Sequence, residues 1–269
     1  LLLVKNKTGY QNLVALTTEA WLKGFYYKPR IDKELLRRKS SGLIAASACL
    51  AGEIPQAIIQ GDLKRAERLV LEYQAIFGEG NFFLEIQHHP HLAEQARVNA
   101  ELIALAKKLG LPLLATNDTH YLRPEDAHAQ DILMLVNTNS LADDPERLTM
   151  KNNNFSLRPA EEMAKHFAGA PEALSNTQKI VEACHFEFEL NKYQLPYFNV
   201  PDNLPAEVYL KNLCQEGLNK KYPGRLAEPK ILTRLDYELS VIAKTGFASY
   251  FLIVHDFISW AKKNGIIVG

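Results

Sequence analysis

Two residues of types that bind metal ions follow an apolar stretch near the middle of the chain. Asp118 and His120 come after residues 111–115, where three leucines predict a short buried strand. Residues i and i+2 of a strand point to the same face, so we expect this carboxylate and this imidazole to lie together. Oxygen and nitrogen ligands of this kind suit zinc, manganese or iron. A hydrogen-bonded turn after a strand explains the same pair equally well.

The residues before position 120 alternate between strand and helix patterns. Short strands are predicted at 42–47, 82–86 and 111–115. Asp62 and Gly78 are typical caps of an intervening helix, and a second helix is expected from about His91 to Gly110. This α/β order predicts parallel strands, and functional side chains gather at the carboxyl ends of such strands.

Each predicted strand ends near residues that can bind a metal or transfer a proton. They are Cys49 after the first strand, Glu85, His88 and His89 at the second, and Asp118 and His120 after the third. We expect the three strand ends to converge on one mouth. The alternatives for Cys49 and Glu85 are structural, a buried cysteine and a structural carboxylate. The histidines at 88, 89 and 91 lie in a proline-containing loop, and we expect them to be solvated rather than bound to a metal.

Composition is typical of a folded, soluble protein. The chain is 47% hydrophobic and carries 31 basic and 31 acidic residues, so nucleic-acid binding would have to come from local patches. Three widely spaced cysteines argue against a disulfide framework and a self-contained zinc knuckle. No apolar run approaches the roughly 20 residues of a membrane helix, and no secretory signal is present, so we expect a cytoplasmic setting without membrane partners. The ends of the chain suggest a piece of a longer protein.

Six motifs follow one another along the whole chain. They are KNKTGYQNL at 5–13, GFYYKPRID at 24–32, SACLAGEIP at 47–55, FLEIQ at 83–87, ATNDTHY at 115–121 and the stretch 246–269. In this order they resemble motifs of the family of bacterial DNA polymerase III alpha subunits, the replicative family C polymerases. The last resembles the segment that leads into the family's Gly-Arg-Gly-Ser element in the polymerase palm.

The resemblance implies a chain in two parts. Residues 1–151 would be the C-terminal portion of a PHP domain (polymerase and histidinol phosphatase), a distorted α/β barrel that in many members binds metal ions. By motif, Cys49, Asp118 and His120 match its metal ligands, whereas Glu85 does not. The family's other ligands, including a His-x-His pair, would lie upstream of Leu1.

Residues 152–269 would be the N-terminal portion of the palm region and mainly helical. Helices are predicted at 159–167, 170–184, 206–220, 232–245 and 250–264. In the last helix, a stripe of four apolar residues is expected to be buried: Phe251, Val254, Ile258 and Ala261. Basic residues on these helices are interpreted as solvated, namely Lys211, Lys220, Lys221 and Arg225, and no nucleic-acid-binding residue is assigned.

The function that the resemblance implies is template-directed addition of dNTPs to a DNA 3′ end with magnesium. The PHP metal site, with zinc or manganese, would add 3′–5′ exonuclease proofreading. Implied partners are the DNA template-primer, the sliding clamp, the clamp loader and the proofreading subunit. The polymerase Asp-x-Asp motif would lie beyond Gly269, so no catalytic residue is assigned. Asp143 and Asp144, beside Pro145, are interpreted as a solvated turn.

Two alternatives belong to other functional classes. A stand-alone PHP phosphoesterase would have no need of residues 246–269. An inert PHP scaffold would have no need of Cys49, Asp118 and His120. A barrel that lacks its first strands would expose an unpaired sheet edge, so we also expect poor solubility of the chain expressed alone.

Overall fold

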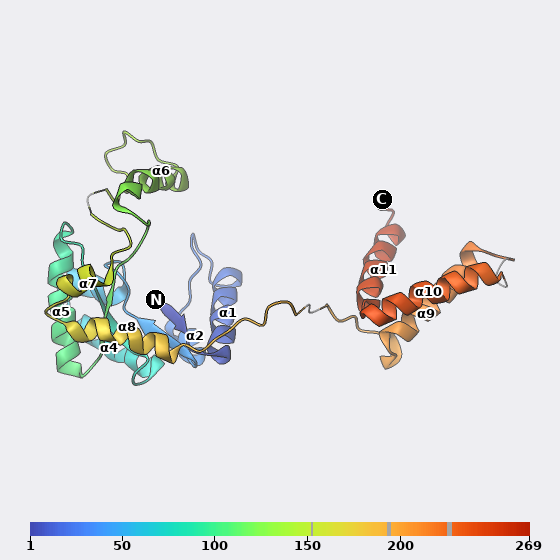
Figure 1. Cartoon of the computed structure of the whole chain (residues 1–269), viewed down its shortest axis with the longest axis horizontal. Helices are drawn as coiled ribbons and strands as arrows, with labels where there is room; N and C mark the ends of the chain where they lie inside the picture. The colour runs from blue at the N-terminus through green and yellow to red at the C-terminus, as the bar shows by residue number, and fades with distance from the viewer. Residues whose placement is uncertain (152, 193–194, 225–227) are drawn as a thin grey trace. The chain divides into compact units, whose positions relative to one another are not determined.

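A computed structural model describes the chain except residues 152, 193–194 and 225–227. The predicted start of the second part and Arg225 therefore lie outside the described residues. The structure divides into two compact units, Leu1–Glu187 and Phe188–Gly269. Figure 1 shows the helices and strands of both units.

The first unit is built on one four-stranded sheet with strand order β1-β2-β3-β4. β2, β3 and β4 are parallel, which confirms the predicted topology, and β1 adds an antiparallel edge strand that was not predicted. The described residues form an open mixed α/β sheet rather than a closed barrel. The strands are β1 (Leu2–Val4), β2 (Leu43–Ala46), β3 (Phe82–Gln87) and β4 (Leu113–Thr116).

Helices connect these strands. The predicted caps are confirmed: the Asp62 side chain accepts a hydrogen bond from the Arg65 amide, and Gly110 takes the left-handed conformation after the helix that ends at Leu109. The helices of this unit are α1 (Lys7–Leu22), α2 (Lys33–Arg38), α3 (Glu53–Ile59), α4 (Leu63–Phe77), α5 (Ala93–Leu109), the short 3-10 helix η1 (Pro124–Asp126), α6 (Ala127–Thr138), α7 (Ala160–His166) and α8 (Pro171–Ala183).

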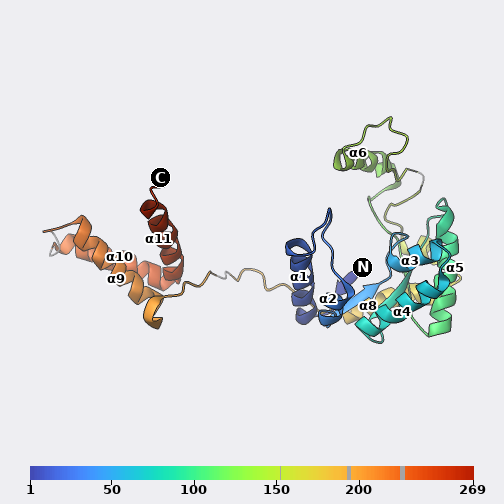
Figure 2. The ribbon, with the colours of Figure 1, turned by 180° about the vertical axis from the view of Figure 1, so that it is seen from behind.

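Helices cover both faces of the sheet, as the two opposite views show (Figure 1, Figure 2). Leu84 and Ile86 of β3 face the larger core, which α3, α4 and α5 complete. Phe83 faces the other side, where Ile180 of α8 packs against it. The α8 side chain of Asn176 also donates a buried hydrogen bond to the backbone oxygen of Leu113. Because α8 belongs to this packing, the first compact unit extends to Glu187. The domain boundary expected at residue 151 stays a prediction.

The second unit has a small core of Leu210, Ala248 and Leu252. The predicted buried stripe of the last helix is wrong: Phe251 is 44% exposed, and Ala248 and Leu252 make the contact instead, one helical turn apart. Lys211, Lys220 and Lys221 are exposed, as predicted. The helices are the short 3-10 helix η2 (Pro201–Asn203), α9 (Ala206–Lys221), α10 (Pro229–Thr245) and α11 (Ala248–Lys263).

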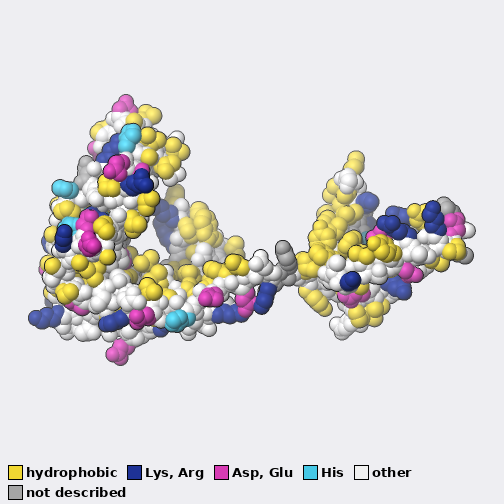
Figure 3. Space-filling view, in the orientation of Figure 1, with side chains coloured by type: hydrophobic (Ala, Val, Ile, Leu, Met, Phe, Trp, Pro, Cys, Tyr) yellow, Lys and Arg dark blue, Asp and Glu magenta, His cyan; other side chains and the backbone are white. Residues whose placement is uncertain are grey.

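Hydrophobic side chains cover much of the visible face of the second unit (Figure 3). Tyr250, Phe257 and Trp260 of α11 are each about half exposed or more. No single helix among the described residues is long and apolar enough to cross a membrane. α10 and α11 pass that test of length and composition only when taken together, and they are bent by 113° relative to each other.

Candidate metal site at the strand ends

Asp118 and His120 lie together, as predicted, but not for the predicted reason. β4 ends at Thr116, and Asp118 takes a left-handed conformation with a φ of 52°. The two side chains therefore meet across a turn and not along one face of a strand. His120 Nε2 lies 3.3 Å from Asp118 Oδ1, and each side chain is about one third exposed. A carboxylate and an imidazole at this distance can share a proton or one metal ion.

The three strand ends are not level. Ala46, the last residue of β2, pairs with Phe83 near the start of β3, whereas β3 and β4 run on together to the pair Gln87 and Thr116. The end of β2 is thus four residues short of the end of β3, about 13 Å at the rise of a strand.

Cys49 follows β2, in a turn that the Gly52 amide closes with a hydrogen bond to the Cys49 oxygen. Its side chain is partly buried and its thiol is free. The described residues contain no group of three or more His, Cys, Asp or Glu side chains placed to hold a metal ion. The expected convergence of the strand ends is therefore not found: Asp118 and His120 come together, and Cys49 does not complete a cluster with them.

Glu85 ties the ends of the parallel strands together. It is 5% exposed, and its Oε1 accepts hydrogen bonds from Thr116 at 2.6 Å and from Gln87 at 3.0 Å. The Glu85 amide donates to the hydroxyl of Ser47, just after β2. The Oε2 atom is buried without a hydrogen-bond partner among the described residues. Glu85 therefore acts as a brace, with one buried oxygen still able to accept a proton donor or bind a cation.

The prediction that His89 is solvated is wrong. The residue is 2% exposed, and neither ring nitrogen has a hydrogen-bond partner among the described residues. Its ring packs against Phe155 with centroids 4.5 Å apart. Burial lowers the pKa of His89, and the Asp118 carboxylate partly offsets that effect. A buried imidazole with two unsatisfied nitrogens is uncommon in proteins, so this side chain is a candidate functional residue that the sequence analysis missed.

The neighbouring histidines differ. His88 stacks on His166 of α7 with ring centroids 3.7 Å apart, and burial lowers the pKa of His88. His91 is exposed, as predicted. Burial of His89 could not be predicted from the local pattern, because the residues that cover it come from a segment more than sixty positions later in the chain.

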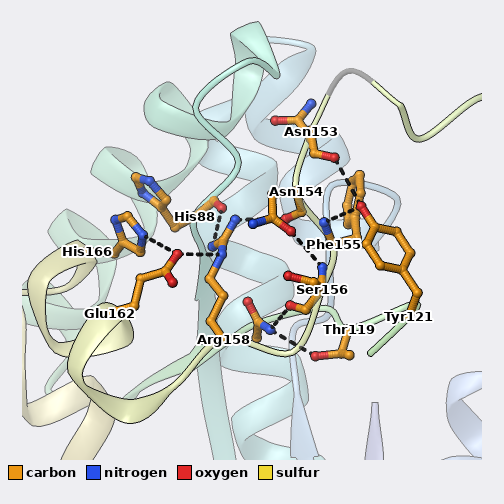
Figure 4. A network of polar contacts seen from close by, with 11 residues as sticks. His88, Thr119, Tyr121, Asn153, Asn154, Phe155, Ser156, Arg158, Glu162 and His166 are labelled. Atoms are coloured by element: carbon orange, nitrogen blue, oxygen red, sulfur yellow. Dashed lines mark hydrogen bonds and ion pairs between the residues drawn. The ribbon is translucent and has the colours of Figure 1, made fainter. Parts of the chain in front are cut away.

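We call residues 153–158 the clamp segment. This segment packs alongside the loop that holds Asp118 and His120 (Figure 4). Tyr121 and Ser156 form a parallel bridge. The His120 amide donates to the Phe155 oxygen at 2.9 Å, and the side chain of Asn117 donates to the Ser156 oxygen at 2.6 Å. The backbone on both sides of Asp118 is therefore fixed by the clamp segment.

Arg158 extends the clamp to the loop after β3. It is 8% exposed and donates to the backbone oxygens of His88 at 3.0 Å and of Asn154 at 2.8 Å. Its Nε lies 3.3 Å from a carboxylate oxygen of Glu162 in α7, as an ion pair without hydrogen-bond geometry (Figure 4). One guanidinium thus connects the loop after β3, the clamp segment and α7.

Comparison with known proteins gives the class of the first unit. A family model described as "PHP domain" matches residues 1–89, and a second, described as "Bacterial DNA polymerase III alpha NTPase domain", matches residues 208–269. The first match assigns residues 1–89, which contain β1, β2 and β3 of the mixed α/β sheet, to the PHP class of domains.

Relatives extend the match along the whole chain. DNA polymerase III subunit alpha of Treponema pallidum is 43% identical over 270 residues, that of Borreliella burgdorferi is 43% identical over 271, and that of Thermus aquaticus is 38% identical over 326. All of this chain is covered in each comparison, and it spans between 23% and 27% of the length of these relatives. The chain belongs to the family of DNA polymerase III alpha subunits.

Proposed function

We propose that this chain is part of a replicative DNA polymerase that adds dNTPs to a DNA 3′ end on a template, with magnesium. One observation carries the proposal: the whole chain aligns with DNA polymerase III alpha subunits at up to 43% identity. In this proposal the helices after residue 152 open the polymerase palm, and the carboxylates that bind the catalytic magnesium lie outside this chain. DNA, the sliding clamp, the clamp loader and the proofreading subunit would be its partners, in the cytoplasm.

We further propose that the PHP unit carries a metal site for 3′–5′ exonuclease proofreading, with Cys49, Asp118 and His120 as its ligands from this chain. The contact between Asp118 and His120 supports this, since carboxylate oxygen and imidazole nitrogen suit zinc or manganese. The site would be completed by residues outside this chain, in a sheet extended to the distorted PHP barrel. When bound, such metals lower the pKa of a coordinated water and offset charge on the phosphate.

The chain's own residues have separate roles in this proposal. Asp118 and His120 bind, and the clamp segment keeps their backbone in place through the His120 amide. Phe155 lies against the rings of both His89 and His120, so it excludes water from the inner side of the site. Cys49 would ligate as a thiolate, which requires loss of its proton on binding.

The test uses the intact protein and three measurements. Asp118→Asn and His120→Ala should lower bound zinc or manganese, measured by mass spectrometry of the metals. Hydrolysis of a DNA 3′ end should fall by at least about 100-fold, more than is usual for changes to outer residues of a metal site. Primer extension should be unchanged. Asp143→Asn, an exposed carboxylate outside the site, is the control.

An inert scaffold is the second candidate, and the lack of a three-ligand cluster among the described residues favours it. A correctly folded intact protein without bound metal would exclude the exonuclease and leave the polymerase proposal standing. A stand-alone phosphoesterase gains no support, because the polymerase family model matches residues 208–269. Failure of primer extension by the intact protein would exclude the polymerase proposal itself.

A further inference from the structure

The end of α1 and the loop between α1 and α2 expose a group of aromatic side chains. The loop projects beyond the end of α1 in both ribbon views (Figure 1, Figure 2). Trp21, Phe25, Tyr26 and Tyr27 are 58%, 54%, 65% and 80% exposed. The rings of Trp21 and Phe25 stack at 5.5 Å, and those of Tyr26 and Tyr27 meet edge to face at 4.6 Å. We call residues 21–30 the aromatic loop.

The aromatic loop has a defined backbone. The Arg30 amide donates to the Gly24 oxygen at 3.2 Å, and the Tyr26 amide donates to the Lys28 oxygen at 3.1 Å. A side chain at Gly24 would place its Cβ 2.0 Å from the Arg30 oxygen, so this closure requires glycine. Tyr27 takes a φ of 57°, an uncommon conformation for a bulky residue. Strained residues of this kind cluster at sites that bind ligands.

The charge of the aromatic loop is positive. It contains Lys23, Lys28 and Arg30 and no acidic residue, in a chain whose basic and acidic residues are equal in number. The Arg30 guanidinium lies over the Tyr26 ring, 5.2 Å from its centroid. Lys23 pairs with Glu19 of α1 at 3.0 Å, on the exposed surface where such pairs are weak.

We propose that the aromatic loop binds single-stranded nucleic acid. Exposed aromatic rings interleaved with lysine and arginine fit this ligand, because every base can stack on a ring and the phosphates pair with the cations. An apolar protein partner would leave Lys28 and Arg30, which have no ion pair among the described residues, without counter-charges, so the observations favour an anionic ligand with flat rings. This site is separate from Asp118 and His120, and the proposal goes beyond the proposed function.

Photocrosslinking locates the contact in the intact protein. A 15-nucleotide strand of deoxythymidine with 5-iododeoxyuridine is irradiated with the protein in EDTA, and the crosslinked peptides are mapped by mass spectrometry. We expect crosslinks to Phe25, Tyr26 or Tyr27. Crosslinks found only elsewhere, with the aromatic loop peptides unmodified, would overturn the proposal. The matched ribonucleotide strand shows whether the loop prefers DNA to RNA, and a duplex should crosslink less.

Matched variants test each side chain type. Tyr27→Ala should reduce the crosslink yield at the loop at least about fivefold, the size expected for one stacked base. Lys28→Gln should reduce the yield at low salt and make it less sensitive to added salt. Tyr197→Ala and Lys64→Gln are the controls, since both residues are exposed and lie outside the loop. Equal losses in variants and controls would contradict the proposal.

The crosslinking result at the aromatic loop does not depend on the proposed metal site. EDTA removes bound metal, so crosslinking at the aromatic loop can succeed even if the exonuclease proposal fails. Tyr27 is 80% exposed, so its replacement leaves the fold intact. Protection of the loop from hydrogen exchange in the intact protein without any DNA would show that another part of the protein covers it, and that result would also overturn the proposal.

Discussion

The motif at residues 5–13 has a structural role, and the contacts of Gly9 show what it is. Asn6 caps α1 by accepting a hydrogen bond from the Gly9 amide, and the Lys5 amide bonds to the Gly42 oxygen. A Cβ at Gly9 would lie 1.9 Å from that same oxygen. The motif therefore joins the start of α1 to the turn before β2.

Replacing Gly9 should weaken the first unit. Gly9→Ala forces the backbone of α1 away from Gly42, and we expect a loss of about 1–3 kcal/mol in the free energy of unfolding, as for an overpacked core. Urea denaturation followed by circular dichroism measures it. Gly169→Ala, where an added Cβ meets nothing within 4 Å, is the control. Equal stability of the two variants would contradict the close approach.

Asp131 in α6 is a buried carboxylate with strong partners. It is 2% exposed and receives hydrogen bonds from Arg147 at 2.8 Å and from Thr149 at 2.7 Å, with Lys151 2.8 Å away. Hydrogen bonds from Arg147, Lys151 and Thr149 hold the pKa of this carboxyl well below its ordinary value of 3.8. The charged form is therefore favoured in the folded protein.

Asp131 should make local stability depend on pH. Because its folded pKa lies below its unfolded pKa, its contribution is fully present above pH 3.8 and is lost as pH falls toward the folded pKa. Asp131→Asn should speed hydrogen exchange of the α6 amides at pH 6, and the difference from the unchanged protein should shrink below pH 3.8. Asp143→Asn, an exposed carboxylate in the same segment, should have little effect at any pH.

For single residues, the sequence predicted the contact between Asp118 and His120 and missed the burial of His89. Two side chains that are two positions apart can meet along a strand or across a turn. The contact was therefore predicted correctly, although a turn and not a strand produces it. His89 is covered by Phe155, and no local pattern shows which distant residue will cover a loop.

Among the elements, the clamp segment makes a specific prediction. Arg158→Ala leaves the oxygens of His88 and Asn154 without their donor, at a cost of about 1–3 kcal/mol for each buried group. Hydrogen exchange should increase in the loops 88–92 and 117–121 and not in β3. Arg158→Lys should restore little of the lost protection from hydrogen exchange, because an ammonium cannot reproduce the planar fork of the guanidinium. Unchanged exchange in both loops would contradict the clamp.

The three parallel strands and the helices α4 and α5 were predictable because their caps and apolar spacing are local features. β1 was missed because it has only three residues, and α3 because it has seven. The stagger between β2 and β3 depends on the hydrogen-bond register between residues 37 positions apart, such as Ala45 and Phe82, which periodicity does not encode. The positions of the strand ends were therefore predicted correctly, but the stagger keeps the end of β2 away from the ends of β3 and β4.

For the molecule as a whole, the two units should differ in independent stability. The first unit has an extensive core and the second buries few large side chains, while Phe257 and Trp260 stay exposed. We expect residues 1–187 to unfold cooperatively on heating and residues 188–269 to be partly folded or aggregated. Circular dichroism melts and size-exclusion chromatography of the two pieces measure this. A monodisperse, cooperatively melting second piece would contradict it.

The sequence analysis based its prediction of poor solubility on an unpaired sheet edge, and the structure suggests a different cause. The sheet edge at β4 is partly satisfied, since Asn176 donates to the Leu113 oxygen, and the other edge is the short strand β1 of three residues. Exposed apolar side chains of the second unit are the greater liability. The boundary predicted at residue 151 lies where strand-helix alternation stops, and the first packing unit extends beyond it to Glu187.

The parallel bridge between Tyr121 and Ser156 has a consequence for the order of folding. It closes a loop of more than thirty residues that includes α6, and such closure costs roughly 3 kcal/mol of chain entropy before the new contacts form. β3 and β4 can pair before that closure, whereas the turn of Asp118 and His120 gains its supports only afterwards. The candidate site should therefore be among the last parts of the first unit to form during refolding and among the first to open.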